Sequence, residues 1–188
     1  MEKINVKCLI KSFVEDMKYK KMGIRFCKAT EENLDEIIDL MQSIGKKKDA
    51  EIFDKEIYLK MLKSSPCIMA SKDNKAIAIL LTEPANDEDI PYTINFVFCE
   101  VLPKYKGNDL ERKMISYVIS ILEDSNSKAP YLWHIVWCIN QNNNALLNIA
   151  EECGFKIYGK TNTDKNESKV VLSRKIWCGE WKSLNKYE

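Results

Sequence analysis

The sequence has no apolar run that approaches about 18 residues, the length that a helix needs to cross a bilayer. We therefore expect no membrane contact. The sequence also lacks an excess of charge of either sign, because 29 Lys and Arg balance 28 Asp and Glu. A protein dedicated to nucleic acid carries a net basic surface, so we expect no nucleic-acid partner.

Histidine and closely spaced cysteines are also scarce. His134 is the single histidine, and none of the seven cysteines has C-x-x-C spacing. Zinc sites and disulfide frameworks depend on such residues, so the sequence predicts neither, and no metal. Most cysteines lie in apolar runs, where a thiol behaves as a small hydrophobic side chain. The N-terminus, MEKINVKCLIKSF, has no apolar signal-peptide core, and together these features predict a reduced, cytoplasmic protein.

Hydrophobic periodicity divides the chain into short strands and amphipathic helices. The expected strands cover residues 24–28, 67–71, 75–82, 93–101, 131–139, 155–159 and 169–176, and the expected helices cover residues 30–44, 53–62, 110–122 and 143–153. Asp73 and Asn74 favour a tight hairpin turn between the second and third strands. The order β-α-α-β-β-β-α-β-α-β-β predicts an α/β (mixed α+β) fold, with a mixed sheet flanked by helices.

No repeat or linker divides the chain, so we expect one domain over residues 23–177, an N-terminal extension (1–22) and a C-terminal tail (178–188). The extension contains six lysines and three acidic residues. This composition fits a basic face that contacts an acidic partner such as RNA, and it fits a segment that packs its apolar side chains on the domain. Trp177 and Trp181, four residues apart, fit either a homodimer contact or packing of the C-terminus.

Residues 101–115 are the most informative part of the sequence. A strand ends there, a loop containing Gly107 follows, and a helix begins at Leu110. The free N–H groups and the positive dipole end of a helix N-terminus bind anions such as a diphosphate. The nearby cations are Lys104, Lys106, Arg112 and Lys113.

This segment, VLPKYKGNDLE (residues 101–111), resembles the V-x-P-x-Y-R-G-x-G-[IL]-[GA/Q] signature of the GNAT superfamily of N-acetyltransferases, which bind acetyl-CoA there. A second segment, NNALLNIAEECGF (residues 143–155), is similar to the N-x-x-[AS]-x-x-[LI]-x-E-x-x-G-F pattern of the same superfamily. One expected strand separates the two segments, as in that superfamily. The resemblance implies a mostly antiparallel sheet of seven strands with four helices, and a V-shaped split between the fourth and fifth strands.

The resemblance also implies acetyl-CoA as co-substrate, and direct transfer of its acetyl group to a primary amine of a small molecule or polypeptide. It places the pantetheine arm beside the end of the fourth strand and the diphosphate on the loop that follows. The residues assigned to the cofactor in this way are Cys99, Glu100, Val101, Lys106, Gly107, Asn108, Asp109, Leu110, Glu111 and Asn143.

Three residues depart from the loop signature. Lys106 replaces Arg or Gln, Asp109 replaces glycine, and Glu111 replaces Gly, Ala or Gln. Asp109 is the most consequential, because it adds a side chain and a negative charge where the backbone would approach phosphates. The sequence leaves two outcomes open: a retained acetyl-CoA site, or a catalytically degenerate protein that uses the fold for binding or interaction.

Acetyl transfer needs a base for the amine proton and an acid for the leaving thiolate. Glu100 is the candidate base, acting through a water molecule, and pairing with a lysine is its alternative role. Ala150 stands where the superfamily commonly has an acidic tyrosine, which leaves Tyr158 or Tyr105 as candidate acids. His134 fits either a second base or a hydrogen-bonded strand residue.

Overall fold

The computed structural model describes residues 16–44, 54–85, 92–124, 132–162 and 168–177. A helical segment, residues 16–21, comes first, and we call it the N-terminal helical segment. The elements that follow are β1 (Ile24–Lys28), the 3-10 helix η1 (Glu31–Asn33), α2 (Leu34–Ser43), α3 (Lys55–Ser64), β2 (Ile68–Lys72), β3 (Lys75–Pro84), β4 (Thr93–Val101), the 3-10 helix η3 (Pro103–Tyr105), α4 (Leu110–Glu123), β5 (Leu132–Asn140), α5 (Asn144–Glu152), β6 (Lys156–Asn162) and β7 (Ser168–Trp177). The expected order of strands and helices is confirmed.

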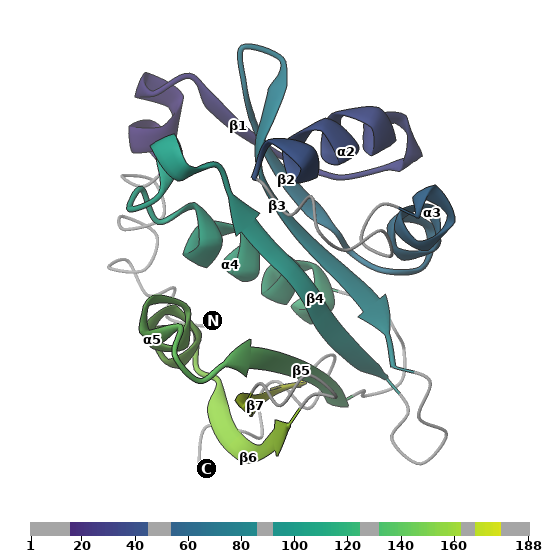
Figure 1. Cartoon of the computed structure of the whole chain (residues 1–188), viewed down its shortest axis with the longest axis vertical. Helices are drawn as coiled ribbons and strands as arrows, with labels where there is room; N and C mark the ends of the chain where they lie inside the picture. Colours follow the sequence, from purple (N-terminus) through teal and green to yellow (C-terminus); the bar gives the residue numbers. More distant parts are fainter. Residues whose placement is uncertain (1–15, 45–53, 86–91, 125–131, 163–167, 178–188) are drawn as a thin grey trace, which may run out of the picture.

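The strands form one mixed sheet of seven with the order β1-β2-β3-β4-β5-β7-β6 (Figure 1). Neighbouring strands are antiparallel except for β4 and β5, which are parallel. A parallel pair needs a crossover connection, and α4 provides it. The mixed, mostly antiparallel sheet is therefore as expected. Four α-helices and the N-terminal helical segment accompany it in the part of the chain that the structure describes.

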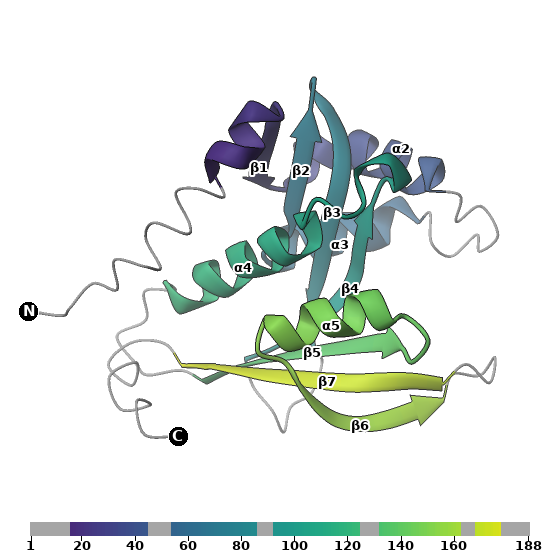
Figure 2. The ribbon, with the colours of Figure 1, turned by 90° about the vertical axis from the view of Figure 1, so that its left-hand side faces the viewer.

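Helices cover both faces of the sheet: α2 and α3 lie on one face, and α4 lies on the other (Figures 1 and 2). Strand β3 is buried on both faces. Ala78 and Leu80 belong to the core that includes α4, whereas Ile79 and Leu81 belong to the core that includes α2 and α3. Burial on two faces explains why β3 is an almost continuous apolar run rather than an alternating one.

A β-bulge divides β4. One residue of β3 pairs with Phe98 and the next pairs with Phe96, so Val97 is the extra residue. The parallel ladder between β4 and β5 ends beside this bulge, at the Phe96–Trp137 pair. Because a bulge bends a strand and increases its twist, the ends of β4 and β5 diverge from this point. This divergence is the V-shaped split expected between the fourth and fifth strands.

Three aromatic rings pack together where the two strands part. The ring centroids of Phe96, Trp137 and Phe155 are 5.4 to 5.8 Å apart, and all three residues are buried. Phe155 lies three residues after the end of α5, so this cluster joins the end of α5 to both strands. Aromatic pairs at this spacing contribute roughly 0.5–1.5 kcal/mol beyond the burial of their area. The cluster therefore fixes the point at which the split begins.

Two helical elements were not anticipated from the sequence: the N-terminal helical segment and η3. Both are shorter than two helical turns, so neither displays a full amphipathic period. The expected hairpin turn is confirmed, since Asp73 and Asn74 have φ values of 51° and 56° and so adopt the left-handed conformation of a type I′ turn. Residues 1–15 and the expected C-terminal tail lie outside the described residues.

The cysteines depart in part from their expected burial. Cys67 and Cys153 are buried, but Cys27 and Cys138 are exposed. Cys138 lies between the buried residues Trp137 and Ile139, and strand alternation turns its side chain to the opposite face. No helix among the described residues is long and apolar enough to span a bilayer.

Candidate functional site

The split between β4 and β5 presents a strand edge to any ligand that enters it. Beyond Phe96, β4 continues to pair with β3 but no longer forms a ladder with β5. The stretch 97–101 therefore turns its β5-facing edge toward the split, where an extended chain with amide groups can pair with it as an added strand. Cys99, Glu100 and Val101, which the sequence assigned to the cofactor, all lie on this stretch.

The loop after β4 leads from this edge to the first turn of α4. The 3-10 helix η3 comes first, residues 106–109 follow, and Leu110 begins α4. The N–H of Lys113 donates to the carbonyl of Asp109 at 3.1 Å and so closes the first helical turn. The N–H groups that precede it belong to the end of the helix that has no intrahelical acceptors. The structure thus brings the predicted loop residues together at a helix N-terminus.

Two residues of the loop adopt the left-handed conformation. Gly107 has φ of 80°, and Asp109 has φ of 62° and ψ of 24°. Space is not what favours glycine at position 107, because a Cβ there would meet no atom within 4 Å. The backbone conformation is the constraint, and it costs most L-residues roughly 1–2 kcal/mol. Aspartate is among the few that tolerate it, so the replacement of glycine at position 109 is compatible with the loop's shape.

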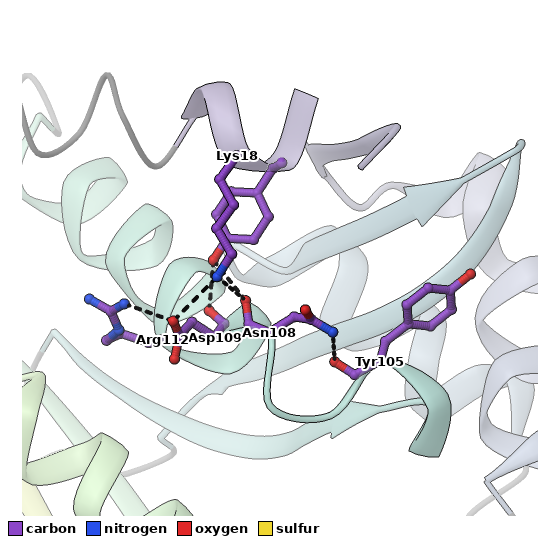
Figure 3. A network of polar contacts seen from close by, with 6 residues as sticks. Lys18, Tyr105, Asn108, Asp109 and Arg112 are labelled. Atoms are coloured by element: carbon purple, nitrogen blue, oxygen red, sulfur yellow. Dashed lines mark hydrogen bonds and ion pairs between the residues drawn. The ribbon is translucent and has the colours of Figure 1, made fainter. Parts of the chain in front are cut away.

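The negative charge of Asp109 is offset by two cations. Its Oδ2 lies 3.2 Å from the guanidinium of Arg112 and 3.6 Å from Nζ of Lys18. Figure 3 shows both cations converging on this carboxylate. Asp109 is half-exposed, so each pair contributes little to stability, at most about 1 kcal/mol. Asp109, Arg112 and Lys18 together carry one net positive charge, and Glu111 in the first turn of α4 offsets it.

The N-terminal helical segment packs against the same loop, which the sequence did not reveal. The hydroxyl of Tyr19 donates to the carbonyls of Asn108 and Asp109, at 3.1 and 3.2 Å. Nζ of Lys18 donates to the Asn108 carbonyl at 3.4 Å. The Asn108 side chain in turn donates to the Tyr105 carbonyl at 2.9 Å (Figure 3). The sequence carries no local signal for the contacts of Lys18 and Tyr19 with the loop, because they join residues about 90 positions apart.

Across the split, Asn143 begins α5. Its side-chain oxygen accepts a hydrogen bond from the N–H of Leu146 at 3.2 Å, so Asn143 caps the helix. Helix capping by asparagine is a sufficient structural reason for the residue. A contact between Asn143 and a cofactor remains a prediction.

Cys99 carries a thiol on the β4 stretch beside the split. Burial raises its pKa well above the ordinary value, and the nearby carboxylates of Glu111 and Glu100 raise it further. A thiol needs a lowered pKa to act as a nucleophile. The raised pKa disfavours the thiolate form of Cys99.

The predicted catalytic side chains lie apart in the structure. Glu100 neighbours Cys99 and Val101, which pack on the core that includes α4, so strand alternation places the Glu100 side chain on the opposite face, where α2 and α3 lie. Tyr158 lies on the outer strand β6 with 83% of its surface exposed, and β7 and β5 lie between that strand and β4. The structure does not bring these two residues onto neighbouring strands.

The other candidate residues have defined surroundings. Ala150 is completely buried in the core. Tyr105 lines a cavity of about 870 Å³ between η3, α2 and the β2–β3 hairpin. His134 pairs with Thr93 at the end of the β4–β5 ladder farthest from the split, and burial, followed by the charge of Lys175, lowers its pKa. Among the described residues, no group of His, Cys, Asp and Glu could hold a metal ion.

No family model and no curated protein sequence matches this chain. Solved structures do match it. An acetyltransferase of the GNAT family from Streptococcus pneumoniae has a TM-score of 0.65 at 14% identity, and the match covers 81% of this chain and 99% of that one. The ribosomal-protein-S18-alanine N-acetyltransferase from Escherichia coli has a TM-score of 0.66 at 15% identity, with 88% and 99% covered. Naa50 from Arabidopsis thaliana, in complex with the bisubstrate analogue CoA-Ac-MVNAL, has a TM-score of 0.64 at 12% identity, with 81% and 98% covered.

These likenesses cover most of this chain and almost all of each neighbour. The seven-stranded sheet, its parallel β4–β5 pair and its split agree with them. The predicted GNAT fold is therefore confirmed.

The left-handed conformation of Asp109 predicts an unusual order of stability among its variants. We expect Asp109→Ala to unfold with about 1 kcal/mol less free energy than Asp109→Gly, because only alanine incurs the left-handed penalty. Urea unfolding measures the difference. Asp124, at the other end of α4, has φ of −88° and provides the matched control, where alanine should be at least as stable as glycine. The same order at both positions would contradict this account of Asp109.

The raised pKa of Cys99 predicts a slow reaction with alkylating reagents. At pH 8 we expect iodoacetamide to modify the exposed Cys138 at least about tenfold faster than Cys99, because the thiolate is the reactive form and each pKa unit changes its population about tenfold. Mass spectrometry of peptides after timed labelling separates the two sites. Equal labelling rates in the folded protein would show that Cys99 is ionised and accessible.

Proposed function

We propose that this chain, which has the GNAT fold, is an acetyl-CoA-dependent N-acetyltransferase that acts on a primary amine of a small molecule or polypeptide. The observation that carries the proposal is the continuity of the free β4 edge with a left-handed loop and the N-terminus of α4. An extended chain with amide groups would pair with the β4 edge, and an anionic group at its end would meet the loop and the N-terminus of α4. Acetyl-CoA has this layout, with its pantetheine amides followed by a diphosphate.

Most cofactor contacts in this proposal come from the backbone. The β4 stretch that contains Cys99, Glu100 and Val101 pairs with the pantetheine arm, and the amides of residues 106–111 surround the diphosphate. Backbone contacts do not depend on side-chain identity, so Lys106 and Glu111 are compatible with them. Asn143, which caps α5, is assigned to the cofactor by the resemblance to the GNAT superfamily.

In the reaction, the nitrogen of a neutral amine attacks the thioester carbonyl carbon, and a new C–N bond forms as the C–S bond breaks. The amine loses one proton, and the departing thiolate of CoA gains one. We assign the removal of the amine proton to Glu100 acting through water. Water protonates the thiolate, with Tyr158 as the side-chain alternative, because Ala150 offers no proton.

Only analogy with a neighbouring structure supports one kind of amine acceptor over another. The Arabidopsis neighbour is bound to an analogue that joins CoA to the sequence MVNAL, which supports a polypeptide amine among the acceptors. A small-molecule amine fits the chemistry equally well. The second candidate function, a degenerate GNAT-fold binding module, is favoured by the complete burial of Ala150 at the usual acid position.

Binding of acetyl-CoA is the first prediction of this proposal. Thermal unfolding with acetyl-CoA or CoA at about 100 times its dissociation constant should show about 2.7 kcal/mol of stabilisation, a shift of a few degrees in the melting temperature. ATP at the same concentration is the control, because it has phosphates but no pantetheine arm. The absence of any shift at millimolar acetyl-CoA would exclude the acetyltransferase and favour the binding module.

The role of Glu100 gives a second prediction. With an amine acceptor identified by release of free CoA thiol, Glu100→Gln should lower kcat about 100-fold near pH 7, because the amide cannot accept the proton. The acetyl-CoA melting shift should persist, since position 100 binds the cofactor through its backbone. Glu152→Gln, on the exposed side of α5, is the matched control and should retain wild-type kcat. A Glu100→Gln enzyme with normal kcat would assign the base elsewhere.

A further inference from the structure

The contact of Tyr19 with the Asn108 carbonyl bears on the direction of the loop amides, whereas the Asp109 carbonyl also accepts from the N–H of Lys113 in the first turn of α4. In a planar trans peptide, the carbonyl and the N–H of the same peptide unit point in opposite directions. The carbonyls of Asn108 and Asp109 both accept from the Tyr19 hydroxyl, so both are directed at the N-terminal helical segment. The N–H groups of the next residues, Asp109 and Leu110, must therefore point away from that segment.

The side to which these amides point is the side of α5. The N-terminal helical segment and α5 lie on opposite sides of α4 in both views (Figures 1 and 2). α5 borders the split in which the cofactor is proposed to lie. Tyr19 thus helps to hold the Asn108 carbonyl out of the split and the Asp109 amide toward it, while the hydrogen bond from Lys113 to the Asp109 carbonyl already orients the Leu110 amide. Glycine-rich phosphate loops achieve the same orientation by backbone conformation alone, whereas here a second element of the chain contributes.

Lys18 lies on the carbonyl side of the loop, where its Nζ donates to the Asn108 carbonyl at 3.4 Å, and it reaches an anion on the amide side by turning past the Asp109 carboxylate. Lys18 and Arg112 both contact Oδ2 of Asp109. Nζ of Lys18 is the more distant, at 3.6 Å, and the guanidinium of Arg112 lies at 3.2 Å. The Lys18 side chain is 44% exposed, so its pair with Asp109 is easily exchanged. Lys113 is different, because it is 10% exposed and lies 2.8 Å from Asp16. Lys113 therefore anchors the helical segment, and Lys18 remains exchangeable.

We propose that the N-terminal helical segment is part of the acetyl-CoA site, with Tyr19 as a positioning residue for the loop amides and Lys18 as a ligand of a CoA phosphate. In the unliganded protein Asp109 holds Lys18 at the loop. When CoA binds, Lys18 turns from the carboxylate to the more highly charged phosphate. This inference rests on the proposed function, because it needs CoA to bind in the split.

Lys18 is tested by comparing ligands with and without phosphates. Calorimetric titration of Lys18→Met should show acetyl-CoA binding about five- to tenfold weaker than wild type at low salt, and a smaller loss at about 1 M salt. S-acetyl-pantetheine, which lacks all phosphates, should bind both proteins equally. Lys21→Met, on the same helical segment and exposed, is the matched control and should bind acetyl-CoA as wild type does. Dephospho-CoA distinguishes the phosphates: an undiminished effect assigns Lys18 to the diphosphate, and a lost effect assigns it to the 3′-phosphate.

Tyr19 is tested without any ligand. Tyr19→Phe keeps the ring that packs edge-on against Phe26 at 5.0 Å but removes the hydroxyl. Hydrogen exchange of the unliganded protein should become severalfold faster at the amides of residues 107–111, while exchange in β2 and β3 stays unchanged. Acetyl-CoA binding should weaken in parallel.

The outcomes separate this inference from the function on which it rests. Wild-type protein that binds acetyl-CoA, with Lys18→Met and Tyr19→Phe binding as tightly, would overturn the inference and leave the proposed function intact. Equal losses for acetyl-CoA and S-acetyl-pantetheine in Lys18→Met would also overturn the phosphate contact. Wild-type protein that binds neither ligand would overturn both proposals together.

Discussion

The end of the hydrogen-bonded ladder between β4 and β5 is the constraint on which the rest of the site depends. Two parallel strands ordinarily remain paired to their ends. Here the bulge at Val97 bends β4 away from β5, so their pairing stops at Phe96. The cluster of Phe96, Trp137 and Phe155 then fills the angle, so that the strands part at a fixed place. Without the bulge there would be no free edge, and the loop and α4 would follow a strand already paired on both sides.

The loop after β4 follows this opening, and its proposed role in binding an anion has to contend with a negative side chain. Two left-handed residues are needed for the turn into α4, and the second of them is an aspartate. Its conformation is tolerated, but its charge opposes a phosphate unless cations lie close by. Arg112 supplies one from the first turn of α4, and Lys18 supplies the other from the N-terminal helical segment. The N-terminal helical segment and the substitution at Asp109 are therefore two parts of one arrangement.

The sequence predicted the features that are encoded locally and missed those that join distant segments. Strand and helix order, the Asp73–Asn74 turn and the loop after β4 follow from periodicity and short motifs, and the structure agrees with them. The left-handed state of Asp109 was not predicted, because glycine in a signature does not say whether space or backbone angle requires it. The contacts of Lys18 and Tyr19 have no local pattern at all. The places of Glu100 and Tyr158 relative to one another depend on strand order, which periodicity alone does not determine.

The absence of the usual acidic tyrosine is less damaging to acetyl transfer than the loss of a base would be. A lysine-like amine has a pKa near 10.4, so at pH 7 its deprotonation is uphill by about 3.4 pKa units, roughly 4–5 kcal/mol. A thiol has a pKa near 8.5, so protonation of the leaving thiolate at pH 7 is downhill by about 1.5 units, roughly 2 kcal/mol. Water can supply that proton without help from a positioned side chain. If Glu100 is the base, as proposed, a chain with alanine at position 150 keeps the group that the harder proton transfer needs.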